Sequence, residues 1–164
     1  MAPIQKPGRS KQDYATPHNF LTAVKRLLSI DRFTFDFAAD YQNAVAPAFY
    51  DVTVDALSKS DWSYRCGSGW GWLNPPYANI GPWAKKCQQC KKEGGQIAFL
   101  VPAGVGANWF RDYVDGVAKV LLLNGRLAFM KDKPTWLYPK DCILCLFSPS
   151  IKPEYAVWSW KALV

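Results

Sequence analysis

The sequence has little of what several classes of protein require. It contains one histidine, His18, among 164 residues. That residue falls early in an expected helix, where an exposed polar side chain is the commoner role and a proton acceptor the rarer one. No apolar run approaches the length that crosses a bilayer, and the first residues lack the apolar core of a signal peptide. We therefore expect a cytoplasmic protein with no membrane segment.

Internal repeats are also absent, and biased composition is confined to the first dozen residues. A hydrophobic fraction of 49% with 20% charged residues is typical of a globular protein. At this length the chain fits one domain with a substantial core. We expect a flexible basic arm over residues 1–13 and a single domain over residues 14–164.

Acidic residues are scarce relative to basic ones. There are 13 Asp and Glu against 20 Lys and Arg, which gives a net charge of +7. A basic surface gains affinity for polyanions by releasing counterions from phosphates. The charge balance favours a nucleic acid as partner without saying which kind.

The five cysteines include two CxxC pairs, Cys87/Cys90 and Cys142/Cys145, which invite a zinc interpretation. The first pair lies in an expected helix, where positions i and i+3 share a face. The second lies in an apolar stretch typical of a buried strand, where residues three apart point to opposite faces. The second pair therefore cannot chelate one ion, and we expect no metal and reduced, mostly buried thiols.

Periodicity predicts helices that alternate with strands. A helix is expected to begin with Thr16 as N-cap and Pro17 as its first residue. Other expected helices cover residues 43–50, 82–93 and 109–114, and expected strands cover residues 33–38, 70–73, 96–101, 117–123 and 142–147. The alternation implies a three-layer α/β fold with a mostly parallel sheet.

The segment Asn74-Pro75-Pro76-Tyr77 is suited to gripping a planar amine. Proline removes N–H donors and leaves carbonyls that only accept, Asn74 adds an amide oxygen, and Tyr77 adds a flat stacking face. An exocyclic NH2 is a poor nucleophile because its lone pair is delocalised into the ring. If the Asn74 oxygen and the Pro75 carbonyl accept its hydrogens, that lone pair is freed. The alternative is a strand that ends in a Pro-Pro turn, with Tyr77 packed on the core.

The context of this segment favours a functional site. In open α/β sheets, ligands bind outside the carboxyl ends of the strands. Asp36 and Asn74 each stand at the end of an expected strand, which places both on the same rim.

Short motifs in a fixed order extend the argument over most of the chain. They are YATP (14–17), FDFAA (35–39), NA (43–44), AL (56–57), DW (61–62), NPPY (74–77), IGPW (80–83), LVPA (100–103), NWF (108–110) and GRLAF (125–129). The ordered set resembles the phage-type DNA adenine-N6 methyltransferases, the Dam-like group of S-adenosylmethionine-dependent enzymes. The resemblance covers roughly residues 14–147.

The resemblance implies a Rossmann-like methyltransferase fold in which S-adenosylmethionine lies across the first strands and the target adenine enters beside Asn74. Thr16 and Pro17 would line the methionine end of the cofactor. Asp36, with Ala38, would stand at the acidic cofactor motif, where a carboxylate can face the cofactor's ammonium group. The alternative for Asp36 is a solvated carboxylate at a strand end.

By the same resemblance, Asp61 would accept from the amino group of the cofactor's adenine, and Trp62 would pack near that ring. A surface turn residue is the alternative for Asp61. Residues 37–40 read Phe-Ala-Ala-Asp, where many methyltransferases carry glycines that let the backbone approach the cofactor. This departure leaves the affinity for the cofactor open.

DNA contacts are expected from loops around the pocket, over residues 63–69, 103–107 and 130–140. The last loop mixes cations with aromatic rings, which suits phosphate contact and base stacking, and equally suits a solvated loop. The nucleic-acid-binding candidates are Arg126, Lys131, Lys133, Trp136 and Lys140.

The sequence therefore predicts methyl transfer to adenine N6 in double-stranded DNA, without a metal, in a bacterial or phage-infected cytoplasm. The base would be flipped into the pocket, because a paired base cannot reach it. One alternative is another planar amine as acceptor: cytosine N4, an RNA base or a protein glutamine. A second is a catalytically silent DNA-binding protein with the same fold. The sequence does not indicate the oligomeric state.

Overall fold

The computed structural model describes residues 15–130 and 136–164. Its helices are α1 (His18–Leu28), η1 (Ala56–Ser58), α2 (Trp62–Cys66), α3 (Gly81–Lys92), η2 (Phe110–Val114) and η3 (Trp160–Leu163). Its strands are β1 (Phe35–Asp36), β2 (Gly71–Leu73), β3 (Ile97–Pro102), β4 (Lys119–Leu123), β5 (Ala128–Phe129), β6 (Trp136–Leu137), β7 (Cys142–Phe147) and β8 (Tyr155–Trp158). The predicted alternation of helices and strands is confirmed.

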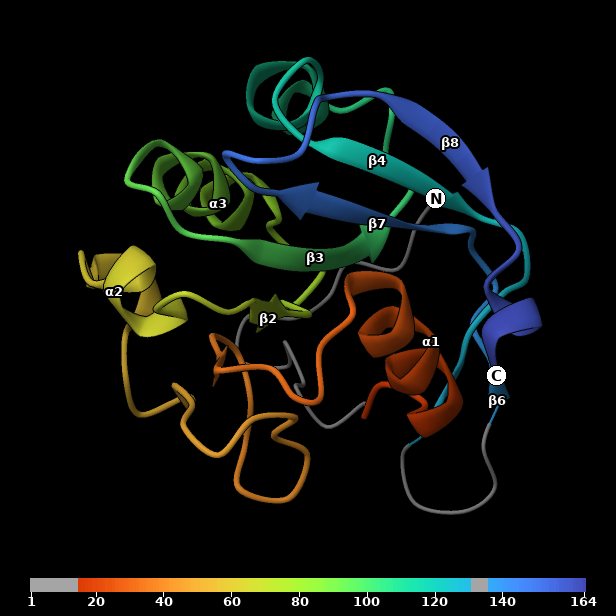
Figure 1. Cartoon of the computed structure of the whole chain (residues 1–164), viewed down its shortest axis with the longest axis horizontal. Coiled ribbons are helices and arrows are strands. Elements are labelled where there is room, and N and C mark those ends of the chain that lie inside the picture. Colours follow the sequence, from red (N-terminus) through yellow and green to blue (C-terminus); the bar gives the residue numbers. More distant parts are fainter. Residues whose placement is uncertain (1–14, 131–135) are drawn as a thin grey trace.

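One six-stranded sheet organises the molecule, in the order β1-β2-β3-β7-β4-β8 (Figure 1). The pairs β1–β2, β2–β3 and β4–β8 are parallel, whereas β7 is antiparallel to both of its neighbours. The predicted mostly parallel sheet is therefore confirmed, with β7 as its reversed strand. Strands β5 and β6 form a separate antiparallel hairpin.

Two apolar cores, one on each face of the sheet, create the three layers. On one face, α3 and η2 pack on strand residues such as Phe99. On the other, α1 and η3 pack on residues such as Leu100. Cys145 belongs to the first core and Cys142 to the second, so the predicted opposite orientation of this CxxC pair is confirmed.

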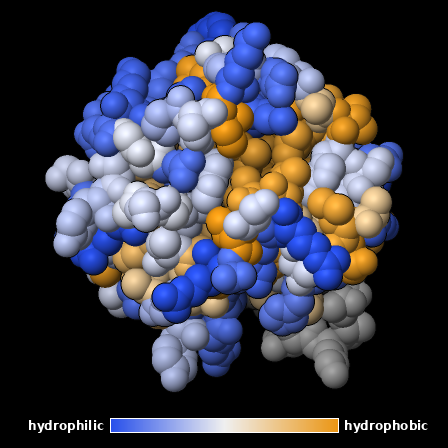
Figure 2. All heavy atoms as spheres, in the orientation of Figure 1, coloured by the Kyte–Doolittle hydropathy of each residue, from blue (hydrophilic) through white to orange (hydrophobic). Residues whose placement is uncertain are grey.

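The outer surface carries both apolar and polar side chains. In the view of Figure 2, apolar side chains gather over the central strands and polar side chains surround them. No helix among the described residues is long and apolar enough to cross a membrane.

Two sequence predictions about helices are wrong. Helix α1 begins at His18 with Pro17 as N-cap, because the Thr16 hydroxyl is hydrogen-bonded to Asn74 instead of capping the helix. Residues 43–50 form no helix. Instead, this segment runs beside β1: the Asp36 N–H donates to Ala48 and the Asp36 carbonyl accepts from Tyr50, a pairing that a helix would prevent.

Close packing around β2 makes Gly71→Ala a test of this fold. A Cβ at Gly71 would lie 2.5 Å from Cε2 of Phe37 and 3.0 Å from Sγ of Cys66, and both of these residues are buried. We predict that the substitution lowers the free energy of unfolding by about 1–3 kcal/mol, as overpacking does. The measurement is urea unfolding. The control is Gly106→Ala, whose Cβ would meet nothing within 4 Å and should cause no loss; equal stability of the two variants would contradict the packing.

Candidate functional site

Two parallel strands end side by side and present the predicted site residues. Asp36 is the last residue of β1, and Asn74 follows Leu73, the last residue of β2. Asp36 is paired in register with Trp72, two residues before Asn74. The structure therefore places Asp36 and the Asn-Pro-Pro-Tyr segment on the same rim of the sheet.

Hydrogen bonds occupy both ends of the Asn74 side-chain amide. Its Nδ2 donates to Oγ1 of Thr16 at 3.2 Å, and its Oδ1 accepts from the hydroxyl of Tyr77 at 2.6 Å. Thr16 is buried, whereas Asn74 and Tyr77 are partly exposed. Oδ1 of Asn74, the atom expected to accept from an amine, thus already accepts one hydrogen bond from Tyr77. The Tyr77 side chain can rotate about its single bonds.

The β5–β6 hairpin packs directly on Tyr77. The Tyr77 ring lies 6.4 Å from the ring of Phe129 and 6.0 Å from that of Tyr138, and the last two rings are themselves 5.4 Å apart. Burial raises the pKa of the Tyr77 hydroxyl well above its usual range, so this group stays protonated and able to donate. The loop expected to contact DNA is therefore joined to the loop expected to hold the base.

Asp36 is a buried carboxylate. Its Oδ1 accepts from the N–H of Ala38 at 3.2 Å, and its Oδ2 accepts from the N–H of Val45 at 3.1 Å. Burial raises the pKa of Asp36 to about 6, although these two hydrogen bonds act in the opposite direction. Its burial excludes the solvated strand-end alternative, and a carboxylate so placed would gain from a cationic partner.

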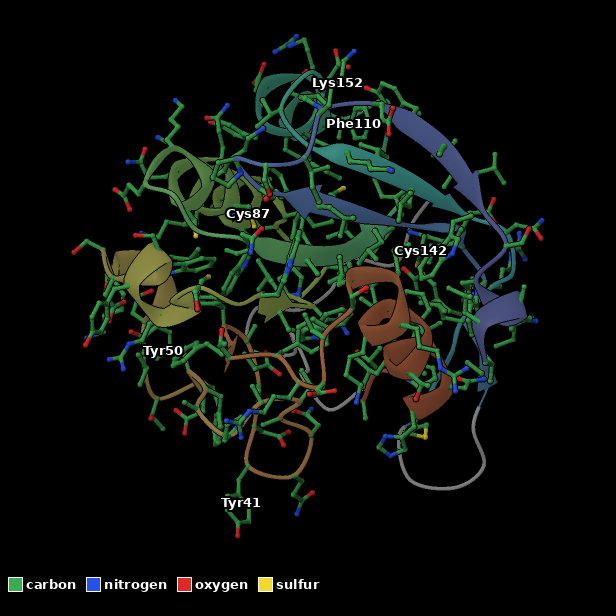
Figure 3. All side chains as sticks on the ribbon, viewed as in Figure 1. Tyr41, Tyr50, Cys87, Phe110, Cys142 and Lys152 are labelled. Carbon is green, nitrogen blue, oxygen red and sulfur yellow. The ribbon has the colours of Figure 1, made fainter. Side chains whose placement is uncertain are left out.

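Asp61 and Trp62 have partners in the segment after β1 and in α2. Both carboxylate oxygens of Asp61 accept from the Tyr50 hydroxyl at 2.7 Å, and Oδ2 also accepts from Nε of Arg65. The Trp62 ring is buried, stacks on Phe37 at 4.2 Å and donates to a backbone carbonyl. Figure 3 shows Tyr50 close to α2, which begins at Trp62. These residues join β1 to α2 within the first core, and we do not assign Trp62 to a cofactor pocket.

The predicted nucleic-acid-binding residues have different surroundings. Arg126 forms an ion pair with Asp141 at 3.1 Å, and Lys140 is exposed. Trp136 is in β6, paired with Phe129. Lys131 and Lys133 lie outside the described residues.

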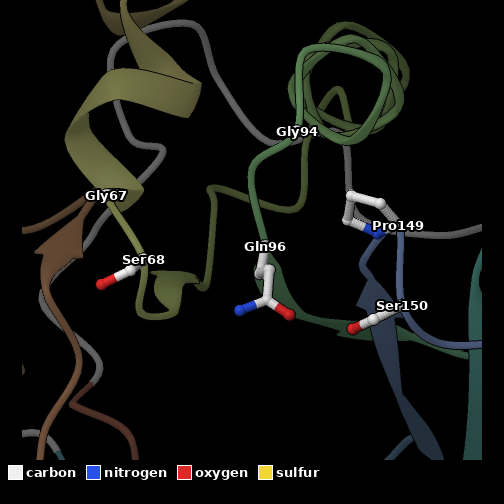
Figure 4. A pocket seen from close by; sticks show the side chains of 6 residues that line it. All are labelled: Gly67, Ser68, Gly94, Gln96, Pro149 and Ser150. Atoms are coloured by element: carbon white, nitrogen blue, oxygen red, sulfur yellow. The ribbon is translucent and has the colours of Figure 1, made fainter.

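Of the three predicted base-reading loops, residues 103–107 follow β3 and lie at the same end of the sheet as Asn74. Residues 63–69 do not: residues 63–66 belong to α2, and the segment precedes β2, so it lies at the opposite end. That prediction is wrong. The opposite end carries a shallow cavity of about 240 Å³ that contains none of the predicted catalytic or cofactor-binding residues, although two residues of the 63–69 loop line it (Figure 4). Its lining residues are Gly67, Ser68, Gly94, Gln96, Pro149 and Ser150.

Sequence reasoning missed several neighbours of the site. Ala15 exchanges two backbone hydrogen bonds with Met130, at 2.8 and 3.0 Å, which ties the segment before α1 to the hairpin. Tyr138 was predicted only as part of a loop that mixes cations with aromatic rings, and no local signal in the sequence placed it beside Tyr77. His18 is exposed, in its expected role. Among the described residues, no group of three or more His, Cys, Asp or Glu side chains could hold a metal ion.

Comparison with known proteins identifies one family. The model of the family described as DNA N-6-adenine-methyltransferase (Dam) matches residues 5–161, nearly the whole chain. No curated protein sequence matches the chain significantly.

The burial of Asp36 gives a prediction about pH. Because its folded pKa of about 6 exceeds the usual 3.8, the stabilising contribution is complete below pH 3.8 and is lost as the pH rises through 6. The loss amounts to roughly 3 kcal/mol of unfolding free energy. Carboxyl NMR titration should give a midpoint near pH 6 for Asp36. In the same spectra, exposed Asp51 should titrate below its usual range, because the Thr53 side chain hydrogen-bonds to it. A midpoint near 4 for Asp36 would contradict the geometry.

Proposed function

Because the chain belongs to the Dam family of DNA N-6-adenine-methyltransferases, we propose that it methylates the N6 amine of adenine in duplex DNA from S-adenosylmethionine, with the base held at residues 74–77. The observation that carries this proposal is the Asn74 amide. This amide follows the end of β2, beside the Asp36 carboxylate at the end of β1, and its oxygen accepts a hydrogen bond from the Tyr77 hydroxyl.

The chemistry at Asn74 is a matter of acceptors. An adenine N6 has two hydrogens and a lone pair delocalised into the ring. Oδ1 of Asn74 and the carbonyl of Pro75 accept those hydrogens, which draws the nitrogen toward tetrahedral geometry and localises its lone pair. Fixed acceptors of this kind stabilise the positive charge that develops on nitrogen during transfer. The excess proton leaves to water once N6 is a cation.

The residues present suit a cationic cofactor. S-Adenosylmethionine, when bound, supplies a methyl group made electrophilic by its sulfonium. Asp36 offers a buried carboxylate to the cofactor's ammonium, and Ala38, whose N–H donates to that carboxylate, has a small side chain. The segment that carries Thr16 and Pro17 borders the same rim through the bond from Asn74. Asp61 is bonded to Tyr50 and Arg65, and its carboxylate keeps further lone pairs with which it would accept from the amino group of the cofactor's adenine.

Tyr77 changes partner when a base enters. In the structure its hydroxyl donates to Oδ1 of Asn74, and the proposed exchange turns the ring away so that Oδ1 receives the amine. The same rotation presents its face to a flipped base, and base–aromatic stacking is worth about 1–3 kcal/mol. Flipping is required because a stacked and paired adenine cannot reach the acceptor.

The hairpin is the proposed DNA contact. Arg126 precedes it in the sequence, and Lys131, Lys133 and Trp136 fall within residues 128–137 of the sequence. The rings of Phe129 and Tyr138 pack against Tyr77. Lysine and arginine contacts to phosphate position a protein on the duplex without reading its sequence. The hairpin would therefore align the duplex with the pocket that receives the base.

The first test measures the reaction and its product. We predict that purified protein, tritium-labelled S-adenosylmethionine and random duplex DNA give labelled N6-methyladenosine on nucleoside analysis. Asn74→Ala should lower kcat by about 10²–10³-fold, since it removes one preorganised acceptor. Asn124→Ala, at an exposed asparagine after β4, is the matched control and should keep wild-type activity. Label in N4-methylcytosine would show that the acceptor is cytosine N4 instead of adenine N6. DNA binding with no label would favour a catalytically silent protein.

The Tyr77 hydroxyl and ring make separable contributions. Tyr77→Phe keeps the stacking face and removes the donor that occupies Oδ1 of Asn74, so kcat/KM should equal or exceed that of the wild type. Tyr77→Ala removes the face and should lower kcat/KM by about 10–100-fold, the equivalent of one base–aromatic stack. Melting temperatures of both variants control for folding. If Phe and Ala prove equally inactive, the hydroxyl itself is needed and the proposed exchange of partners is wrong.

A further inference from the structure

We propose that Thr16 is a positioning residue: it holds the Asn74 amide so that Oδ1 faces the pocket, instead of contacting the cofactor. This inference rests on the proposed function, because it concerns the residue that would receive the adenine amine. The resemblance described above implies that Thr16 lines the methionine end of the cofactor. The structure gives its hydroxyl a different partner, Nδ2 of Asn74.

The two hydrogen bonds of the Asn74 amide differ in whether they would persist when a base binds. The bond at the oxygen end comes from Tyr77, whose ring turns away in the exchange of partners proposed above. The bond at the nitrogen end goes to Thr16, a side chain with 4% of its surface exposed. When Tyr77 leaves, the Thr16 contact is therefore the one that keeps the amide plane in place.

The chain around Thr16 is fixed on both sides. Pro17 follows it, which disfavours helical dihedrals at Thr16 and holds it extended. Ala15 precedes it and is bound to Met130 by hydrogen bonds in both directions. Beyond Pro17, α1 is anchored through buried residues such as Phe20. The Thr16 hydroxyl is thus presented to Asn74 from a rigid support.

An asparagine side chain needs such a support. It turns about two single bonds, so an amide that lost its bond to Thr16 would rotate to find another partner for its N–H. That rotation would carry Oδ1 away from the amine. A misplacement of about 1 Å at a reacting group can cost about 100-fold in rate.

The same support connects Asn74 to the DNA contact proposed above. The Ala15–Met130 bridge joins the residue before Thr16 to the β5–β6 hairpin. The hairpin and the Asn74 amide are therefore held by neighbouring residues of one extended segment. A duplex that binds the hairpin meets an Asn74 whose orientation is already set.

The test compares Thr16→Val, which keeps the shape but loses the hydroxyl, with Thr16→Ser, which keeps the hydroxyl. Thr22→Val is the matched control on α1, because the Thr22 hydroxyl donates to the carbonyl of His18 in its own helix. We expect Thr16→Val to lower kcat by about 10–100-fold, in the range that misplacement of a reacting group produces. Calorimetry should show unchanged binding of S-adenosylmethionine. Thr16→Ser and Thr22→Val should keep kcat within about threefold of the wild type, because neither removes the hydrogen bond to Asn74.

A second readout does not depend on activity. The side-chain 1H–15N pair of Asn74, assigned from its loss in Asn74→Asp, should shift and exchange faster in Thr16→Val, but not in Thr16→Ser or Thr22→Val. Unchanged Asn74 signals in Thr16→Val would overturn the inference. So would weaker cofactor binding with kcat intact, which would make Thr16 a cofactor contact. Absence of methylation by the wild type would overturn the proposed function alone, since the NMR comparison still decides the role of Thr16.

Discussion

The pairing of β1 with β2 is the constraint on which the candidate site depends. These strands are short, yet they lie parallel and in register, so the residues that end them emerge at one edge of the sheet. One strand delivers a carboxylate and the next an amide. Around them, the segment before α1, the loop after β3 and the β5–β6 hairpin occupy the same end of the molecule.

The polar groups at this edge are organised before any ligand arrives. Asp36 has two backbone donors and a raised pKa caused by burial, so it is a carboxylate that a cation would stabilise. Asn74 is bonded at both ends of its amide. Folding therefore already orients these groups. Binding of the base would mainly require that Tyr77 change its hydrogen-bond partner. Such preorganisation is how enzymes without a strong base or a metal obtain most of their rate.

The sequence predicts the sheet and the strand-end site well, for physical reasons. Apolar runs such as residues 142–147 and the Gly81-Pro82 start of α3 are local signals, and both elements lie where expected. The hydrogen-bond partners of Thr16 and Asp61 were not predictable, because each partner comes from another part of the chain. Thr16 is bonded to Asn74, and Asp61 is bonded to Tyr50. Residues 43–50 show the same limit, since pairing with β1 overrides their helical pattern. The position of residues 63–69 could have been predicted, because a segment that precedes the expected strand 70–73 lies at the end of the sheet opposite Asn74.

The most direct test is a crystal structure of the protein with duplex DNA and sinefungin, a cofactor analogue that cannot transfer a methyl group. The account predicts an adenine outside the duplex, with its exocyclic nitrogen within hydrogen-bonding distance of Oδ1 of Asn74 and the carbonyl of Pro75. The Tyr77 ring would be stacked on that base, and the Thr16–Asn74 bond would be retained. A complex in which the Tyr77 hydroxyl still donates to Asn74 while the target base binds elsewhere would contradict it.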